Sequence, residues 1–271
     1  MPLSYNRLSD DHLALLRKKV AVLLAKGAIE RVPVPEEGCG CYSCYFLVPK
    51  KDKGFRPIVE LLALKLFLRK EKFEMMILAQ VLSASDPGDW MVALYLQDAY
   101  FHIPVLPAHR HYLLFVEGHK HFQLTMLPFG LTSAPWVFMK VIAVVVAHLC
   151  RLRVSIFLYL DDWLLRASTP QTVVFHLETT ANLLHSLGFT INMLKSHLTP
   201  SQALPFIRAV LDIVQFGAYT PEKQVQYIQA MILMFLPLSC ILVRKTLGLI
   251  ISCTLLVTYA RWHMWALQWD L

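Results

Sequence analysis

Charged residues and long hydrophobic runs are both scarce in this sequence. Charged side chains make up 17% of its 271 residues, whereas apolar ones make up 56%. The sequence has no internal repeat and no low-complexity tract, which argues against a repeat architecture. A chain of this length and composition can bury a sizeable core, either as one large domain or as two small ones.

A targeting signal and a full-length membrane span are also missing. The first eleven residues are polar and have no apolar core, so they do not form a signal-peptide pattern. Met231–Val243 and Leu247–Ala260 are apolar, but each is shorter than the roughly 20 residues that span a bilayer. We therefore expect an intracellular protein, nuclear or cytoplasmic, with core helices at these two runs and no membrane partner. A small membrane protein built on the runs is the alternative, and partitioning into detergent would identify it.

Cysteine is present, but not in a complete metal-binding set. Cys39, Cys41 and Cys44 look like half of a zinc site, and no matching group of Cys or His follows at a usual spacing. Free thiols are therefore favoured over a zinc site.

Acidic residues are fewer than basic ones, and the imbalance lies near the N-terminus. The net charge is +7, and residues 1–72 hold 14 Lys and Arg against 8 Asp and Glu. This first quarter therefore carries +6 by itself. Such an excess predicts an anionic partner for the N-terminal part, with nucleic acid as the leading candidate.

The pattern of apolar residues, turns and helix caps predicts an α+β fold. Helices are expected over residues 10–26, from 132 or 133 through 147, over 170–187 and beyond 221. Strands are expected over residues 45–48, 55–59, 91–97, 99–105, 112–116, 121–126, 189–198 and 204–214. We expect two helices to pack on one face of an antiparallel sheet and to leave the other face free for a ligand.

Two adjacent carboxylates, Asp161 and Asp162, lie between two runs of strand-type apolar residues. A turn between these strands would place both at the tip of a β-hairpin. Paired acids repel each other unless a cation compensates, and Mg²⁺ takes oxygen ligands of this kind. A solvated turn is the alternative interpretation of the pair taken alone.

Five stretches, in order and at fitting spacing, make the chain resemble the reverse transcriptases of retroelements, most closely the DIRS-like retrotransposon branch. They are Tyr45–Lys51 with Arg56 and Pro57, Leu96–Pro104, Leu127–Pro135, Tyr159–Trp163, and Gly188–Asn192 with Lys195 and Ser196. Ala260–Met264 is also typical of that branch. The resemblance implies a right-hand polymerase fold, with fingers at 1–90, a palm at 91–205 from which 107–127 returns to the fingers, and a thumb-like helical region at 206–271. We expect no ribonuclease H domain.

The resemblance also implies a mechanism, which is template-directed nucleotidyl transfer with two metal ions. The ions would be Mg²⁺, which Mn²⁺ could replace. The partners would be an RNA or DNA template with a primer, and deoxynucleoside triphosphates; the oligomeric state is left open. Asp161 and Asp162 match two metal-binding carboxylates, and Lys195 matches a proton donor to pyrophosphate. Lys50, Arg56, Asp98, Ala99, Tyr100, Phe129 and Gly130 match nucleotide-binding positions, Tyr100 as the steric gate against a ribose 2′-hydroxyl.

One catalytic position departs from the family pattern. The third carboxylate is expected three residues before Asp98, where this sequence has Tyr95. A neutral phenol is a poor Mg²⁺ ligand, and residues three apart on a strand point to opposite faces, so Asp98 cannot substitute unless the strand bends. Further departures are Cys44, Glu60, Leu62, Lys65, Trp136 and Arg208. We therefore predict an impaired polymerase; a non-catalytic nucleic-acid-binding remnant or a domesticated module of the same fold is the alternative.

Overall fold

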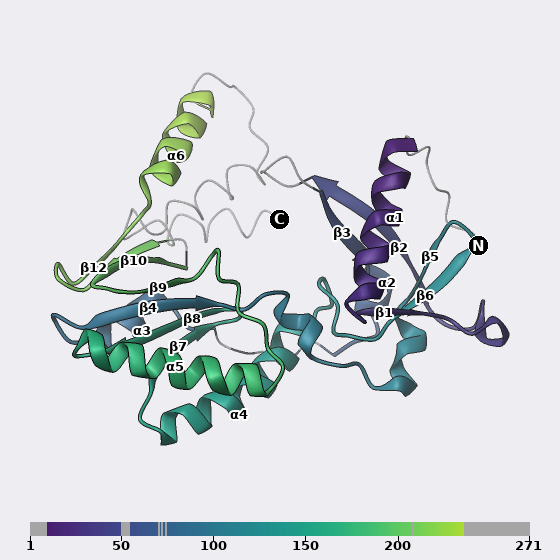
Figure 1. The fold of residues 1–271 in the computed structure, drawn as a ribbon. Helices are drawn as coiled ribbons and strands as arrows, with labels where there is room; N and C mark the ends of the chain where they lie inside the picture. Colours follow the sequence, from purple (N-terminus) through teal and green to yellow (C-terminus); the bar gives the residue numbers. More distant parts are fainter. Residues whose placement is uncertain are drawn as a thin grey trace. The chain divides into compact units, whose positions relative to one another are not determined.

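The structure is a computed structural model, and it describes residues 10–49, 55–69, 71, 73, 75–207 and 209–235. The chain divides into two compact units, whose elements are labelled in Figure 1. Unit 1 contains residues 1–74, 97–147 and 187–190, and unit 2 contains residues 75–96, 148–186 and 191–271. Helices and mainly antiparallel sheets occur in both units, as the α+β prediction requires. The proposed boundaries of fingers, palm and thumb stay a prediction.

Unit 1 is built around a five-stranded sheet with the strand order β1-β6-β5-β2-β3. Its strands are β1 (Ile29–Arg31), β2 (Tyr42–Pro49), β3 (Phe55–Glu60), β5 (Leu114–Glu117) and β6 (Lys120–Leu124). The strands expected over residues 45–48 and 55–59 form the antiparallel β2–β3 pair, and those expected over 112–116 and 121–126 form the antiparallel β5–β6 pair. Strand β2 runs parallel to β5. Residues 50–54, between β2 and β3, lie outside the described residues. Short helical segments connect the strands: η1 (Val34–Glu36), α2 (Leu62–Lys65), η2 (Ala99–His102) and η3 (Pro107–Tyr112).

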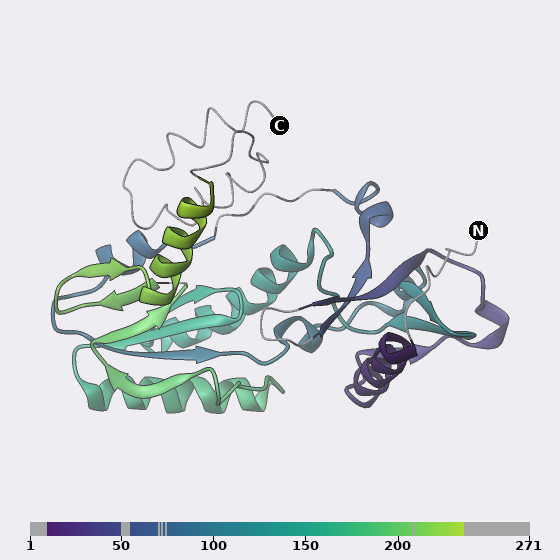
Figure 2. The ribbon, with the colours of Figure 1, turned by 90° about the horizontal axis from the view of Figure 1, so that it is seen from above.

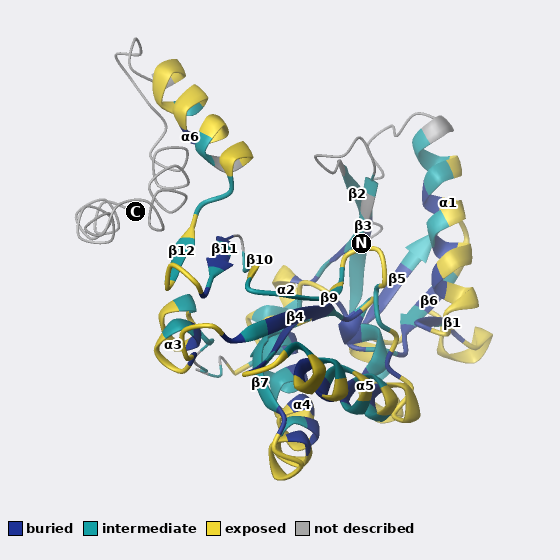
Figure 3. Ribbon diagram, turned by 60° about the vertical axis from the view of Figure 1, so that its left-hand side comes forward, coloured by how far each residue is buried: buried dark blue, intermediate teal, exposed yellow. Residues whose placement is uncertain are grey.

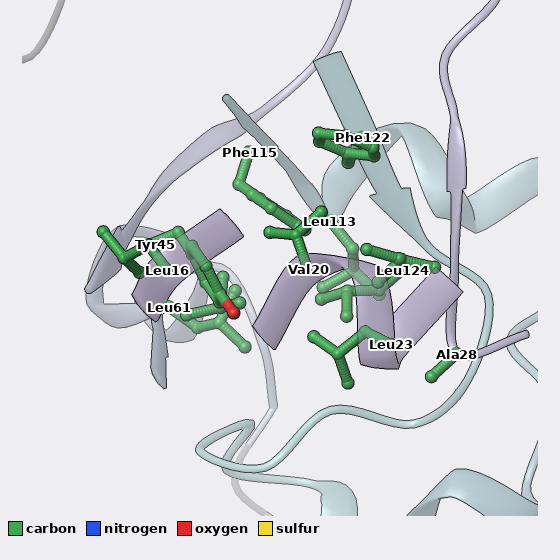
Figure 4. Close-up of a cluster of buried hydrophobic side chains, with 12 residues drawn as sticks. Leu16, Val20, Leu23, Ala28, Tyr45, Leu61, Leu113, Phe115, Phe122 and Leu124 are labelled. Carbon is green, nitrogen blue, oxygen red and sulfur yellow. The ribbon is translucent and has the colours of Figure 1, made fainter. Parts of the chain in front are cut away.

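Helix α1 (Asp10–Ala25), expected over residues 10–26, covers this sheet with an apolar stripe. Leu16, Val20 and Leu23 point into a buried cluster with Phe115 and Phe122, which Figure 4 shows in close-up. The spacing of three and four residues places these side chains on one face of the helix. Burial of this cluster is the main reason that α1 stays on the sheet, since each fully buried leucine or phenylalanine contributes about 1.5–3 kcal/mol.

The end of α1 is set by Gly27, directly after the helix expected over residues 10–26. Gly27 has a φ of 64°, its N–H donates to the carbonyl of Leu24, and the N–H of Ala28 donates to the carbonyl of Leu23 at 3.0 Å. These two bonds form a Schellman cap, which needs a left-handed residue and therefore favours glycine. The cap fixes where Lys26, the residue before the glycine, leaves the helix.

Unit 2 contains a four-stranded antiparallel sheet with the order β7-β8-β4-β9. Its strands are β4 (Trp90–Tyr95), β7 (Ser155–Tyr159), β8 (Asp162–Ala167) and β9 (His197–Ser201). Helix α5 (Pro170–Ser186) packs along β4, β8 and β9, as seen in Figure 1. In Figure 3 the centre of β4 is buried, while the outer side of α5 is exposed.

The opposite face of this sheet is not free along its length, contrary to the prediction. A second sheet of β10 (Ala203–Phe206), β11 (Ala209–Asp212) and β12 (Gly217–Tyr219) lies beside it (Figure 2), and helix α3 (Leu78–Ser83) adds Val81 to the contact. Met91 and Ala93 pack there against Phe206 and Leu211, all fully or almost fully buried. Successive side chains of β4 therefore point alternately into two apolar layers. On the side of the second sheet, this packing extends to Tyr95.

The stretch predicted as a strand over residues 99–105 is instead the 3₁₀ helix η2 followed by extended chain. Asp98 has a left-handed φ of 50°, which ends the extended conformation. The sequence there still alternates apolar residues, so the pattern alone favoured a strand.

Two apolar helices bear on the membrane question. Helix α4 (Ala134–Arg151) is the one helix among the described residues that is long and apolar enough to cross a bilayer, with 28% of it buried. Length and composition alone are weak evidence, because core helices meet the same test. Helix α6 (Glu222–Phe235) is shorter and largely exposed in Figure 3. Most of the two C-terminal apolar runs, and the motif Ala260–Met264, lie outside the described residues.

Candidate active site

The acidic pair lies at the tip of the β7–β8 hairpin, as predicted. Tyr159 pairs with Asp162, so the turn consists of Leu160 and Asp161 alone. Leu160 has a φ of 56°, which is unusual for a bulky residue and is held by the surrounding structure. Its carbonyl accepts a hydrogen bond of 3.2 Å from the indole N–H of Trp163, whose side chain is fully buried. The buried tryptophan thus fixes a tight, strained turn that presents the two carboxylates.

The two carboxylates differ in their surroundings. Asp161 is exposed, whereas Asp162 is half-buried on β8. Burial, together with the charge of Asp161, raises the pKa of Asp162 from 3.8 to about 6, and Lys195 opposes the rise. The site therefore holds more negative charge than its protein surroundings compensate, which is the condition that favours a bound cation.

Tyr95 lies next to this pair, on the neighbouring strand. It is directly opposite Asp162 in the β4–β8 ladder, and the N–H of Leu96 donates to the carbonyl of Asp161 at 2.9 Å. Residues opposite each other on antiparallel strands share a face, so the phenol occupies the position from which a carboxylate would meet the pair. Burial is the largest cause that raises the pKa of Tyr95 to about 12, and the negative charges of Asp162 and Asp161 add to it. The phenol therefore stays neutral at physiological pH and is a poor ligand for a hard cation.

Tyr95 is also held on three sides by other parts of unit 2. Its N–H donates to the hydroxyl of Ser196 at 3.0 Å, and its carbonyl accepts from the N–H of Asn192 at 2.8 Å. Its hydroxyl donates to the carbonyl of Pro205 on β10 at 3.4 Å. Tyr95 thus connects the acidic hairpin to β10 and to the loop that carries Lys195. In that loop the side chain of Asn192 accepts from the N–H of Lys195 at 3.2 Å, which orders the turn.

The expected nucleotide-binding residues that the structure describes gather in unit 1. Ala99 and Tyr100 are buried in η2, and the ring of Tyr100 lies 4.9 Å from that of Phe129 and 5.4 Å from that of Phe138. Asp98 precedes them and pairs with Lys26 at the end of α1. Because β4 ends at Tyr95, alternation along the strand does not describe the direction of Asp98, and its carboxylate is already engaged by a lysine.

Gly130 follows Phe129 in a conformation that favours glycine, with a φ of 93°. A Cβ added there would lie 3.7 Å from the carbonyl oxygen of Val59, which is ordinary contact, so backbone conformation rather than space requires the glycine. Arg56 lies in β3 opposite Val48, and only its backbone is described. Lys50 lies outside the described residues.

The structure brings Asp161, Asp162, Lys195 and Tyr95 together in unit 2. Over the part of the chain that the structure describes, no group of three or more His, Cys, Asp or Glu side chains could hold a metal ion. The acidic pair thus lacks a third carboxylate there. Cys39, Cys41 and Cys44 are free cysteines in the described part of the chain.

Sequence reasoning missed three residues that shape the site: Trp163, which holds the turn, Ser196, which binds the backbone of Tyr95, and Lys26, which pairs with Asp98. Trp163 stood inside a recognised motif, and its buried position in β8 was the available signal. Lys26 lies 72 residues from Asp98 in sequence, so no local pattern points to their contact.

We predict that Asp162→Asn stabilises the folded protein at neutral pH in the presence of a chelator. The folded-state pKa of Asp162, about 6, lies above its ordinary value of 3.8, so its ionisation disfavours the fold as pH rises through 6. The full shift would correspond to about 3 kcal/mol, and partial exposure to solvent reduces the expected gain to on the order of 1 kcal/mol. The gain should appear above about pH 6 and vanish towards pH 4, in urea unfolding followed across that range.

The matched control for this prediction is Glu178→Gln, which removes an exposed carboxylate on α5 of the same unit. It should change the free energy of unfolding by less than about 0.5 kcal/mol at every pH. An Asp162→Asn protein that is less stable than the wild type at pH 7.5 would contradict the electrostatic account of the hairpin tip.

Comparison with solved structures identifies the fold. A foamy viral protease–reverse transcriptase in complex with double-stranded DNA superposes with a TM-score of 0.74 at 16% identity, covering 93% of this chain and 42% of that one. The same kind of protein in complex with an RNA/DNA hybrid gives a TM-score of 0.72 at 17% identity, over 92% of this chain and 32% of that one. The fold is therefore that of the right-hand polymerases.

The family follows from the sequence comparison. The family model described as reverse transcriptase (RNA-dependent DNA polymerase) matches residues 48–228, and the chain belongs to this family. Among its relatives is the Transposon Tf2-3 polyprotein of Schizosaccharomyces pombe, 24% identical over 155 residues, which make up 57% of this chain and 12% of the polyprotein. The Tf2-4 polyprotein of the same organism matches to the same extent. The chain is thus a reverse transcriptase domain of the retroelement type, and the matched part is a small fraction of such polyproteins.

Proposed function

We propose that this chain is the nucleotidyl-transfer domain of a retrotransposon reverse transcriptase and that its own activity is weak. Its substrates would be deoxynucleoside triphosphates and a primer annealed to an RNA or DNA template. The observation that carries the proposal is the hairpin tip: two carboxylates in a strained, tryptophan-held turn, with a tyrosine directly opposite Asp162. The two carboxylates support the reaction, and the tyrosine opposite Asp162 supports its impairment.

Asp161 and Asp162 would hold Mg²⁺, or Mn²⁺ in its place. Bound there, the ion would supply Lewis-acid stabilisation of the triphosphate and would lower the pKa of the primer hydroxyl. Burial and the charge of Asp161, which together raise the pKa of Asp162, fit a cation at this pair, and the neutral phenol of Tyr95 does not fit a second one. One ion position would therefore be well supported and the other would lack a ligand.

The remaining roles belong to the chain's own side chains. Lys195 lies close enough to lower the pKa of Asp162 and would give its proton to the departing pyrophosphate. Tyr100, packed between Phe129 and Phe138, would border the sugar and exclude a 2′-hydroxyl. Lys50 and Arg56 would bind the triphosphate, whose oxygens suit a lysine point charge and the guanidinium fork. The assignments of Lys50 and Arg56 rest on the family's motifs alone, and those of Lys195 and Tyr100 rest on the motifs together with the positions given above.

Primer extension tests the proposal. On poly(rA) annealed to oligo(dT), with dTTP and either Mg²⁺ or Mn²⁺, we expect slow extension by the wild type. Asp161→Ala should reduce it by about 100-fold or more, since a metal-binding carboxylate supports several kcal/mol of transition-state stabilisation. Glu178→Gln is the control and should retain the wild-type rate.

Absence of extension by the wild type under all these conditions would favour the second candidate function. That candidate is a non-catalytic nucleic-acid-binding module of the same fold, which the tyrosine opposite Asp162 also favours. Extension that survives Asp161→Ala would exclude the acidic pair as the catalytic centre.

Two finer assignments belong to the same proposal. We propose membership of the DIRS-like branch on the motifs Leu96–Pro104 and Ala260–Met264, and a phylogeny of reverse transcriptase domains that places the chain outside that branch would contradict it. Since template, primer and nucleotides are intracellular, we also propose action inside the cell. A fluorescent fusion would show whether the nucleus or the cytoplasm holds it.

A further inference from the structure

Lys26 and Asp98 form an ion pair that joins two distant parts of unit 1. The ammonium of Lys26 donates to the carboxylate of Asp98, and the side chains are 41% and 37% exposed. No motif includes Lys26. We propose that Lys26 is a positioning residue: through Asp98 it sets the turn that carries Tyr100, and so the selection of deoxyribonucleotides over ribonucleotides. This role rests on the proposed function.

The base of Lys26 is rigid, which a positioning residue requires. The Schellman cap at Gly27 ends α1 directly after it. Thr125 then holds the next two residues: its hydroxyl donates to the carbonyl of Gly27, and its N–H donates to the carbonyl of Ala28 at 3.0 Å. Lys26 thus extends from backbone that is fixed by both the helix end and the sheet.

Asp98 is in an unusual state that the ion pair explains. It is the residue before η2, where an aspartate ordinarily turns its carboxylate onto the first N–H groups of the helix. Here the side chain makes no such bond, and only the carbonyl of Asp98 accepts from the N–H of Phe101, at 2.8 Å. The backbone has a left-handed φ of 50°. Lys26 therefore draws the carboxylate away from the helix end and supports a conformation that costs free energy on its own.

The conformation of Asp98 determines where η2 begins, and η2 carries Tyr100. The ring of Tyr100 is buried against Phe129 and Phe138, so a change in the start of η2 would move the ring against fixed neighbours. A steric gate excludes a 2′-hydroxyl only where its ring is held in place. Loosening the turn should therefore change the affinity for ribonucleotides and the affinity for deoxyribonucleotides unequally.

A different role for Lys26 makes a different prediction. If the ammonium contacted the triphosphate directly, its loss would weaken both kinds of nucleotide equally, because their phosphates are identical. The pair is partly exposed, so its contribution to folding is expected to be small. Substitution should leave the fold intact and expose the functional effect.

The test measures nucleotide binding, which needs no catalysis. The protein is saturated with poly(rA) annealed to an oligo(dT) primer that ends in a dideoxynucleotide, and the dissociation constants of dTTP and UTP are determined in Mg²⁺. Lys26→Met, which keeps the aliphatic chain, should reduce the preference for dTTP on the order of five-fold, the size of one partly exposed ion pair. Lys26→Arg should restore the preference, and Lys18→Met, an exposed lysine on the same helix, should not alter it.

A double-mutant cycle with Asp98→Asn separates the two roles. If Lys26 acts through Asp98, Lys26→Met adds nothing to the loss of preference caused by Asp98→Asn. Additive effects, an unchanged preference, or equal weakening of dTTP and UTP would overturn the positioning role. Wild-type protein that binds neither nucleotide would overturn the proposed function itself, whereas wild-type binding with no effect of Lys26→Met would overturn this inference alone.

Discussion

Tyr95→Asp is expected to raise the rate of primer extension by about 100-fold over the wild type, because a third carboxylate would let the hairpin tip support a second ion at several kcal/mol of stabilisation. The geometry favours this outcome. Tyr95 lies directly opposite Asp162 in the strand pair, and the backbone N–H of Leu96 already bonds to Asp161. A carboxylate at this position therefore needs no movement of β4 to reach the pair.

The substitution should also cost stability when no metal is present. It places a third negative charge beside those of Asp161 and Asp162. It also removes the phenol that packs between β4 and the second sheet and donates to the carbonyl of Pro205. We expect Mg²⁺ to raise the melting temperature of Tyr95→Asp more than that of the wild type, since an ion that binds the folded state stabilises it. Tyr95→Asn removes the ring without adding charge, and it should share the packing loss but gain neither activity nor metal-dependent stability.

An active Tyr95→Asn would show that relief of the tyrosine ring, rather than a new ligand, restores the reaction. A Tyr95→Asp protein that binds Mg²⁺ but remains inactive would instead place the main defect elsewhere, among the altered positions at Glu60, Leu62 and Lys65. Both outcomes can be read from the same extension assay with melting curves alongside it.

Local patterns predicted the part of the site that lies within one hairpin. Asp161 lies in the turn between a strand of five residues and one of six, and Asp162 is the first residue of the second strand. Two apolar runs this close in sequence have few solutions other than a tight turn. Tyr95 could be placed opposite the two carboxylates because the family motif fixes its spacing from Asp98 and the alternation of side chains along the strand fixes the face on which it lies. The predicted helices at residues 10–26 and 170–187 were found within a residue, since both begin and end at recognisable caps.

The rest of the site depends on contacts between residues far apart in sequence. The left-handed Asp98 ends a run of alternating residues that otherwise reads as strand, and its partner is a lysine in the first helix. Likewise β10 covers the face of β4 that was expected to be open, through a residue 110 positions from Tyr95. Such contacts leave no periodic signal, because neither partner changes the apolar pattern of its own segment.

Arg166→Met is expected to be the most destabilising of the substitutions considered, by about 3 kcal/mol, because it leaves a buried carboxylate without its partner. Arg166 lies in β8, in the same strand as Asp162, and is 20% exposed. Its guanidinium pairs with Asp89, whose side chain is 5% exposed, and its Nε donates to the hydroxyl of Ser155 at 3.1 Å. The carboxylate of Asp89 also accepts from the N–H of Asp86 at 3.0 Å.

A second substitution separates the cost of the unpaired charge from the loss of arginine packing. Asp89→Asn keeps an oxygen that can accept from the N–H of Asp86, so the double variant Arg166→Met/Asp89→Asn should recover about half or more of the lost stability. Urea unfolding followed by tryptophan fluorescence measures both, since Trp90 and Trp163 lie in the strands that this pair joins. If the double variant is as unstable as Arg166→Met alone, the arginine contributes through its aliphatic packing and its bond to Ser155. The acidic hairpin would then be held at its far end by packing rather than by charge.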